Sequence, residues 1–167
     1  LKGYQKDRLI LFLDPSRDPL GGGYHLSQSK IGIGSGGLFG TGLLNGKLTN
    51  LQFIPEQHTD FIFSAAGEEM GFIGSILIVF LFLIFIILLL RIAKNARTDF
   101  ESLLVIGITS IFLFQIIINI YMTIGLGPVT GIPLPFMSYG RTSLFVNFIF
   151  IGIALSTFKR SISLRKK

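Results

Sequence analysis

The sequence contains no cysteine and little charge. Without cysteine, neither a disulfide nor a thiolate metal site can form. Only 14% of the 167 residues are charged, whereas 50% are hydrophobic and 17 are phenylalanine. This composition is too apolar for a water-soluble domain of this length, so we expect a membrane protein. The chain also begins without methionine and shows no signal-peptide pattern, and we therefore expect it to be a fragment of a longer protein.

The basic residues are concentrated beside hydrophobic segments. A net charge of +6 could indicate a nucleic-acid partner. However, eight of the fifteen basic residues flank apolar runs, and these are Arg91, Lys94 and Arg97 in one short connection and Lys159, Arg160, Arg165, Lys166 and Lys167 after the last run. This distribution is typical of the cytoplasmic flanks of membrane helices. We therefore expect no nucleic-acid partner, and a multi-pass membrane protein with a cytoplasmic C-terminus.

Uncharged stretches predict three transmembrane helices. Residues 71–90 carry no charge, and a helix of that length, at about 1.5 Å per residue, spans the roughly 30 Å hydrocarbon core. The next uncharged stretch, 102–140, is too long for one crossing, and glycine and proline interrupt it after residue 124. The predicted organisation is, in chain order, an extracytoplasmic loop with short helices (1–66), a membrane helix (67–90), a cytoplasmic loop (91–101), a membrane helix (102–124), an extracytoplasmic Gly/Pro loop (125–141), a membrane helix (142–158) and a cytoplasmic tail (159–167).

The Gly/Pro loop is expected to be re-entrant. Its helix-breaking residues are Gly125, Gly127, Pro128, Gly131, Pro133 and Pro135. Backbone that is not helical cannot face lipid, because each unpaired amide there costs several kcal/mol. The loop must therefore be buried in protein or line a cavity. The fold class that follows is an all-α membrane protein with three transmembrane helices and a re-entrant-like loop.

The glycine spacing in the leading segment matches a nucleotide-binding pattern only weakly. Gly32, Gly34 and Gly37 satisfy G-x-G-x-x-G, and Glu56 lies about twenty residues further on, as a dinucleotide fold requires. That fold also needs a preceding buried strand and a βαβ unit, but here more glycines and then membrane spans follow. We favour close backbone or helix packing by small residues.

The densest group of polar residues precedes the first membrane helix. The Glu68-Glu69 pair can complement the positive end of a helix dipole, and Thr59 or Asp60 can cap a short helix. Asp60 differs because aromatic and apolar residues follow it directly, and partial desolvation can tune a carboxylate to act as a general base. From these residues alone, both a cap and a catalytic base stay open.

Metal binding is the next possibility. His25 and His58 could join Glu56 or Asp60 around a metal ion, but strict ligand spacing is absent and two histidines are few, so zinc is disfavoured. Loose assistance by Mg²⁺ or Mn²⁺ to a phosphate leaving group stays open. Beyond these ions the residues indicate no cofactor.

A few polar residues lie within or beside the later spans. Gln115 and Asn119 are four residues apart and share one helical face, and Asn147 could meet them, which indicates hydrogen bonds between helices. Arg141, at the mouth of the third span, could pair with an anionic headgroup, a lipid diphosphate or an acidic side chain.

Ordered blocks along the chain are similar to one family. The blocks are Tyr4–Arg8, Leu13–Pro15, Asp18–Gly21, Gly23–His25, Gln28–Ile31, Gly34–Leu38, Phe53–Glu56, His58–Phe63, Glu68–Gly71, Gly131–Phe136 and Ser138–Gly140. Together they resemble the shape, elongation, division and sporulation (SEDS) family, and its rod-shape branch more than its division branch. The resemblance covers nearly the whole chain.

The resemblance implies a fold and an activity. The fold is a bundle of about ten helices in the bacterial cytoplasmic membrane, of which this chain would supply the last large extracytoplasmic loop and the final helices. The activity is a glycosyltransferase that polymerises lipid II, the undecaprenyl-diphosphate-linked disaccharide pentapeptide, into peptidoglycan beside a class B penicillin-binding protein. The family's essential aspartate matches Asp60. The expected substrate-binding or supporting residues are Gln28, Ser29, Lys30, Glu56, His58, Thr59, Pro133, Pro135, Ser138 and Tyr139, together with Arg141, which is included for its place at the mouth of the third span and not for the resemblance.

Two departures from the family pattern affect this expectation. Arg141 stands where the family usually has a second glycine after Ser-Tyr-Gly, which places a large cation beside the loop. The earlier helices of the bundle are missing, so we expect the fragment alone to be inactive and not to fold alone, because its polar membrane faces would lack partners. Two other functions stay open. The protein could be a transporter of the lipid-linked precursor, because broken hydrophobic segments such as 125–135 are common at transport sites. It could also be a scaffold that only positions a penicillin-binding protein.

Overall fold

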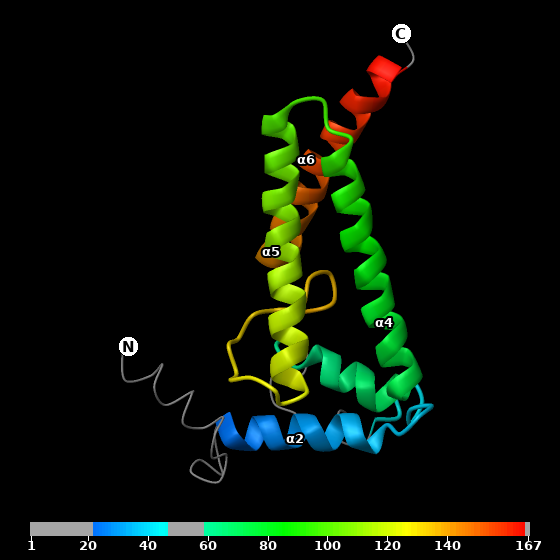
Figure 1. The fold of residues 1–167 in the computed structure, drawn as a ribbon. Helices are drawn as coiled ribbons and strands as arrows, with labels where there is room; N and C mark the ends of the chain where they lie inside the picture. Colours follow the sequence, from blue (N-terminus) through cyan, green and yellow to red (C-terminus); the bar gives the residue numbers. More distant parts are fainter. Residues whose placement is uncertain (1–21, 47–58, 166–167) are drawn as a thin grey trace, which may run out of the picture.

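The computed structural model describes residues 22–46 and 59–165, and the regular elements there are all helices. They are α2 (Gly22–Ser35), α4 (Ile62–Lys94), α5 (Asp99–Thr123) and α6 (Arg141–Arg165). Helices α4, α5 and α6 form an upright bundle, and α2 lies across one end of it (Figure 1). Each bundle helix is long and apolar enough to cross a membrane. The predicted all-α fold with three transmembrane helices is therefore confirmed.

Helix α4 consists of two helical segments joined at Gly71. This residue has φ +69° and ψ −165°, a conformation that is open to glycine and strained for other residues. The shorter segment, residues 62–70, packs beside α2, and the longer segment turns into the bundle (Figure 1). The helix extends at both ends beyond the uncharged residues 71–90 that marked it in the sequence.

The loop that follows α2 packs against this kink. At the start of the longer segment of α4, two backbone N–H groups donate to this loop. The Phe72 N–H donates to the Gly37 carbonyl (2.9 Å) and the Ile73 N–H to the Leu38 carbonyl (3.2 Å). Carbonyl oxygens thus receive N–H groups that have no partner within the helix. The loop backbone therefore satisfies these two N–H groups, and the dipole role of the Glu68-Glu69 pair stays a prediction.

Glycine permits this close approach of two backbones. A Cβ atom on Gly36 would lie 2.1 Å from the Gly67 carbonyl oxygen. One on Gly40 would lie 2.1 Å from the Glu69 carbonyl oxygen. Neither distance is possible for a real side chain, so both positions require glycine. Close backbone packing is therefore found at Gly36 and Gly40, whereas a Cβ atom on Gly34 or Gly37 of the nucleotide-binding pattern would meet no described atom within 4 Å. Gly32 and Gly34 lie within helix α2.

The Gly/Pro loop dips into the bundle between α5 and α6, as expected of a re-entrant loop (Figure 1). Phe136 has a φ of +62°, and its ring centroid lies 5.7 Å from those of Phe85 on α4 and Phe112 on α5. The Phe148 ring of α6 lies 5.9 Å away. Pro135 is fully buried. A single loop side chain therefore contacts all three membrane helices.

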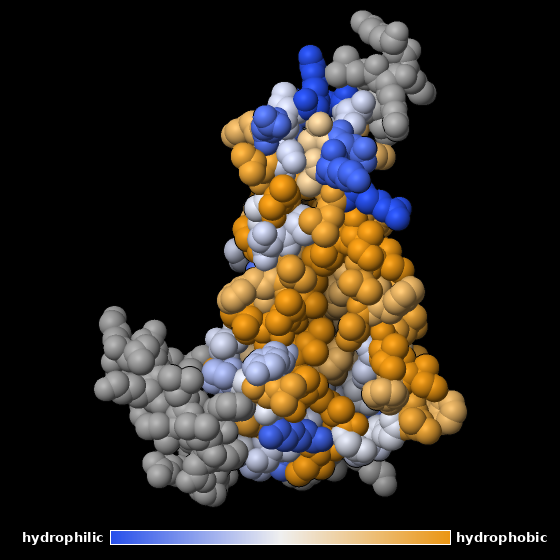
Figure 2. Space-filling view, in the orientation of Figure 1, coloured by the Kyte–Doolittle hydropathy of each residue, from blue (hydrophilic) through white to orange (hydrophobic). Residues whose placement is uncertain are grey.

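The surface is apolar along the bundle and basic at the end far from α2 (Figure 2). Exposed apolar side chains on the three helices include Phe80, Leu83, Phe114, Ile117 and Phe148. The exposed basic residues at the far end are Arg91, Lys94, Arg97, Lys159 and Arg160. Such an apolar band is stable against lipid or against further membrane helices, and the charged end is stable in water.

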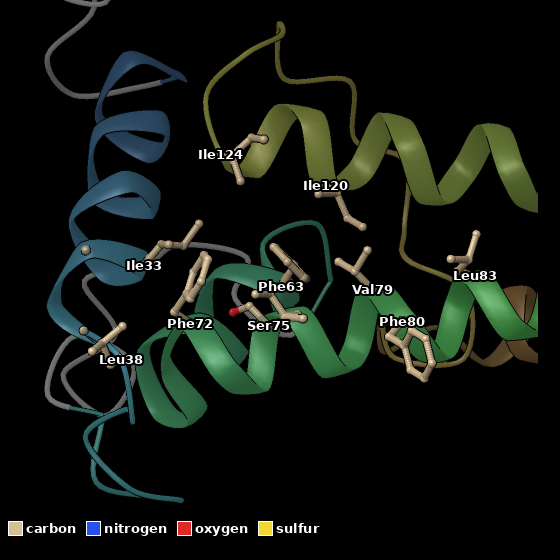
Figure 3. A pocket seen from close by; sticks show the side chains of 13 residues that line it. Ile33, Leu38, Phe63, Phe72, Ser75, Val79, Phe80, Leu83, Ile120 and Ile124 are labelled. Carbon is tan, nitrogen blue, oxygen red and sulfur yellow. The ribbon is translucent and has the colours of Figure 1, made fainter.

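An apolar groove of about 830 Å³ opens where α2, α4 and α5 meet. Its walls include Ile33 of α2, Phe72, Val79 and Leu83 of α4, and Ile120 and Ile124 of α5 (Figure 3). Among the described residues that line it, Ser75 has the only polar side chain, and its hydroxyl donates to the Gly71 carbonyl at 2.9 Å. The groove therefore offers apolar contact and no spare polar side chain for chemistry.

Candidate functional site

Asp60 lies in the turn that leads into α4. It is half-buried, and Phe61 directly after it is 2% exposed. The helix begins at Ile62, so the N-cap position belongs to Phe61, whose side chain makes no capping hydrogen bond. The Phe61 carbonyl accepts the N–H of Ala65 at 3.2 Å, because the helical repeat starts there. The prediction that Thr59 or Asp60 occupies the cap position is therefore wrong.

Two side chains from other elements hold the backbone of this turn. The Nδ2 atom of Asn119, on α5, donates to the Asp60 carbonyl at 2.9 Å. The Ser138 hydroxyl, in the Gly/Pro loop, donates to the Thr59 carbonyl at 2.6 Å. The same hydroxyl oxygen accepts the N–H of Leu134 at 2.7 Å. Tertiary contacts therefore determine where Asp60 lies.

The Asp60 carboxylate lies beside the backbone of the Gly/Pro loop. A Cβ atom on Gly131 would be 3.4 Å from Asp60 Oδ2. Gly131 has a φ of +73°, a left-handed conformation that favours glycine. Asn119 Nδ2 also donates to the carbonyl of the next residue, Ile132, at 2.8 Å. One carboxamide thus holds both the turn and the loop that borders the carboxylate.

Ser29 attaches α2 to the membrane helices next to this site. Its hydroxyl donates to the Thr123 carbonyl of α5 at 2.8 Å. Its own carbonyl accepts the hydroxyl of Ser64 on α4, also at 2.8 Å. Ser29 is fully buried, whereas Gln28 beside it is half-buried. The Ser29 hydroxyl is therefore occupied in anchoring α2, which positions the exposed residues of that helix.

Lys30 reaches from α2 to the first residue of the Gly/Pro loop. A Cβ atom on Gly125 would lie 1.7 Å from Lys30 Cε and 2.6 Å from Nζ, so the lysine side chain covers this glycine. Gly125 has a φ of +77°. The exposed Lys30 side chain thus brings a positive charge to the start of the loop.

Tyr139 and Arg141 border a second depression, of about 500 Å³. Ile62, the first residue of α4, and Ser138 also line it. Tyr139 and Arg141 are both exposed. Ile62 follows the Asp60 turn and Ser138 bonds to it, so the depression lies beside the elements that hold this turn and carries a guanidinium group at its edge.

The remaining predicted residues divide into two groups. Pro133 is half-buried and Pro135 fully buried, so both contribute to the shape of the loop. Glu56 and His58 lie outside the described residues, as does the side chain of His25. Within residues 22–46 and 59–165, no three His, Asp or Glu side chains gather as a metal site would need. Participation of Mg²⁺ or Mn²⁺ stays a prediction.

Asn119 contacts the candidate site in a way that the sequence did not reveal. Its carboxamide donates to backbone carbonyls of the turn and the loop, so the predicted hydrogen bonding to another helix through this residue is wrong. The physical signal was present in the sequence. A re-entrant loop exposes carbonyls inside the bundle, and such carbonyls need donors from the neighbouring helices.

Comparison with known proteins points to one family. A family model described as "Cell cycle protein", covering FtsW, RodA and SpoVE, matches residues 1–161. Peptidoglycan glycosyltransferase MrdB of Escherichia coli K12 is 45% identical over 153 residues, which are 92% of this chain and 41% of that protein. Peptidoglycan glycosyltransferase RodA of Treponema pallidum is 45% identical over 156 residues, which are 93% of this chain and 36% of that protein. Stage V sporulation protein E of Bacillus subtilis is 42% identical over 158 residues, 95% of this chain and 43% of that protein.

A solved structure shares the fold. It is described as "Structural coordination of polymerization and crosslinking by a peptidoglycan synthase complex", and the similarity has a TM-score of 0.79 at 31% identity. The matched region is 96% of this chain and 43% of the solved one. The chain thus spans less than half the length of these relatives, between 36% and 43%.

Proposed function

Since the chain belongs to the FtsW, RodA and SpoVE family of cell cycle proteins, we propose that it is the C-terminal part of a peptidoglycan glycosyltransferase. The proposed reaction is the polymerisation of lipid II at the outer face of the bacterial cytoplasmic membrane, for cell elongation and rod shape. The names of MrdB and RodA, and the peptidoglycan synthase complex in the solved structure, support this proposal.

Asp60 is the proposed general base. A hydroxyl of the acceptor sugar attacks the anomeric carbon of the donor and forms a new C–O bond. The bond from that carbon to the diphosphate oxygen breaks, and the diphosphate leaves with the electron pair. The hydroxyl proton passes to the Asp60 carboxylate. One carboxylate suffices because diphosphate is a good leaving group, whereas glycoside hydrolysis usually needs a second carboxyl group as acid.

The observation that carries this role is the way Asp60 is held. Its backbone and that of Thr59 accept hydrogen bonds from Asn119 and Ser138, which belong to other elements. Its Oδ2 atom lies beside Gly131 of the re-entrant loop, where a Cβ atom would be 3.4 Å away. A base must be held within hydrogen-bonding reach of the proton it accepts, and this arrangement supports that geometry.

Two cationic side chains border the Gly/Pro loop and suit an anionic leaving group. Lys30 lies over Gly125, and Arg141 borders the depression beside Ser138. Either cation could stabilise the negative charge that develops on the departing diphosphate. A divalent ion such as Mg²⁺ or Mn²⁺, if bound to the diphosphate, would supply the same stabilisation as a Lewis acid.

The proposed orientation places the basic end of the bundle in the cytoplasm. The exposed arginines and lysines at that end support it through the positive-inside rule. Residues 1–66, which include Asp60, then lie at the outer face, where a lipid-anchored sugar can reach the Asp60 carboxylate. The proposed partner is a class B penicillin-binding protein, and the synthase complex in the solved structure supports that choice.

The decisive experiment replaces the carboxylate of the full-length protein by an amide. Asp60→Asn should lower the rate of lipid II polymerisation by at least about 100-fold, because removal of a general base costs that much. Membrane insertion and partner binding should be unchanged. Asp99→Asn is the matched control, since Asp99 is exposed in the first turn of α5 at the opposite end of the bundle. Wild-type polymerisation by Asp60→Asn would contradict the assignment.

Two other outcomes would indicate different functions. The loop that interrupts the membrane bundle is also a device of transporters. If vesicles reconstituted with the full-length protein move labelled lipid II across the bilayer without polymerising it, the protein is a transporter. If cells carrying Asp60→Asn grow as rods with normal peptidoglycan, the protein is a scaffold.

A further inference from the structure

Asn119 lies fully buried near the end of a membrane helix, and its carboxamide bridges two non-helical segments. Its Nδ2 atom donates to the Asp60 carbonyl at 2.9 Å and to the Ile132 carbonyl at 2.8 Å. The first acceptor is 59 residues away along the chain and the second is 13 residues away. Both N–H bonds of the amide are therefore used to hold the turn before α4 against the Gly/Pro loop.

A second bridge runs parallel to the first. The Ser138 hydroxyl joins the Thr59 carbonyl to the Leu134 N–H. Consecutive residues of the turn are thus connected to the loop twice, Asp60 through Asn119 and Thr59 through Ser138. The Asp60 Oδ2 atom lies beside Gly131, and the carbonyl of the following residue, Ile132, is one of the two that Asn119 bonds.

We propose that Asn119 is a positioning residue for Asp60, setting the distance between its carboxylate and the backbone of the Gly/Pro loop. The inference rests on the proposed glycosyltransferase activity. Carbonyl groups inside a membrane bundle keep a fixed place only when a donor satisfies them. Without the carboxamide the turn and the loop lose their shared donor, and the carboxylate moves relative to the loop.

The geometry also separates this role from ordinary helix packing. A packing residue would bond to a neighbouring helix, as Ser29 does to Thr123. Asn119 bonds instead to the turn carrying the candidate base and to the loop beside it. The Oδ1 atom of Asn119 is buried and has no hydrogen-bond partner among the described residues, so the two N–H bonds are the polar contacts that define its role there.

The test uses the full-length protein purified with its penicillin-binding partner, and labelled lipid II as substrate. Asn119→Leu keeps a similar volume and removes both donors. We expect kcat to fall at least about tenfold, because a misplacement of about 1 Å can cost about 100-fold. KM for lipid II should change less than about threefold, since the substrate contacts remain. Gln115→Leu is the matched control, because Gln115 lies one turn earlier on the same face and is half-buried; it should keep the wild-type kcat.

A second variant covers the case in which Asn119→Leu does not fold. Asn119→Ser is smaller, and its hydroxyl is too short to reach either carbonyl that Nδ2 bonds, so its kcat should also lie below wild type, whether or not Asn119→Leu folds. Thermal unfolding and complex formation with the partner are measured for every variant, and kcat is expressed per folded complex. The positioning role predicts that kcat per folded complex falls while partner binding persists.

Three results would overturn the inference. They are a wild-type kcat per folded complex in both Asn119 variants, a loss of activity that matches the loss of folded protein, and a raised KM with unchanged kcat, which would make Asn119 a substrate contact. The proposed function is tested separately in the same assay. If Asp60→Asn polymerises lipid II like the wild type, the glycosyltransferase assignment fails whatever the Asn119 variants do.

Discussion

Replacement of Gly71 by alanine should destabilise the protein through the kink of α4. At φ +69° and ψ −165° a non-glycine residue costs about 1–3 kcal/mol of backbone strain. The new Cβ atom would also lie 2.3 Å from the Gly40 nitrogen and 2.8 Å from the Leu38 carbonyl oxygen. The loop must therefore move away from the helix.

Movement of this loop breaks hydrogen bonds. The N–H groups of Phe72 and Ile73 lose their acceptors on Gly37 and Leu38, and each such bond contributes about 0.5–1.5 kcal/mol. Together with the strain, Gly71→Ala should lower the free energy of unfolding by about 2–6 kcal/mol. This is a large fraction of the stability of a typical protein, which is about 5–15 kcal/mol.

Thermal unfolding of the detergent-solubilised full-length protein measures the effect. Gly71→Ala should lower the midpoint by several degrees. Gly107→Ala on α5 is the control, because a Cβ atom there meets no described atom within 4 Å and the backbone is helical. The control should leave stability unchanged or raise it by about 0.5–1 kcal/mol, since alanine favours helix over glycine. An unchanged midpoint for Gly71→Ala would refute the reasoning, because it would mean that α4 can run straight without the contact to the loop.

Two further changes test the packing around the site. Phe136→Ala should lower the free energy of unfolding by about 3–5 kcal/mol, because the ring packs against Phe85, Phe112 and Phe148. Chemical or thermal unfolding measures this loss, and a loss no larger than that caused by Phe145→Ala at an exposed phenylalanine would contradict the prediction. Ser29→Ala should cost about 1–3 kcal/mol, because it leaves a buried carbonyl without its donor. Limited proteolysis of the folded protein measures this second change. We expect faster cleavage in α2 of the variant, and a wild-type cleavage rate would contradict the prediction.

Much of the fold could be predicted from local sequence. The helices follow from the length of the apolar stretches and from the basic residues that flank them, because the bilayer sets the length of a spanning helix. The re-entrant loop follows from its glycines and prolines, because non-helical backbone must be shielded from lipid. The exact helix ends did not follow, since α4 continues through the Glu68-Glu69 pair and turns at Gly71.

The candidate site was predictable in part. Asp60 is recognisable because a carboxylate stands directly before apolar residues at a membrane edge, and the resemblance to a known family points to the same residue. The anchoring role of Ser29 and the contact of Lys30 with Gly125 were not predictable. Both contacts join α2 to segments about 95 residues further along the chain, and no local pattern reports such a distance.

The three membrane helices, the re-entrant loop between the last two, and the carboxylate that precedes the first were determined by the sequence itself. These features depend on composition and order within short windows, where the cost of exposing charge or unpaired backbone to lipid decides the outcome. Only the tertiary structure decided that Asn119 holds the Asp60 turn against the loop and that Gly71 bends α4 around another backbone. Both depend on donors, acceptors and free space supplied by segments far apart in the chain, which meet only when the helices pack.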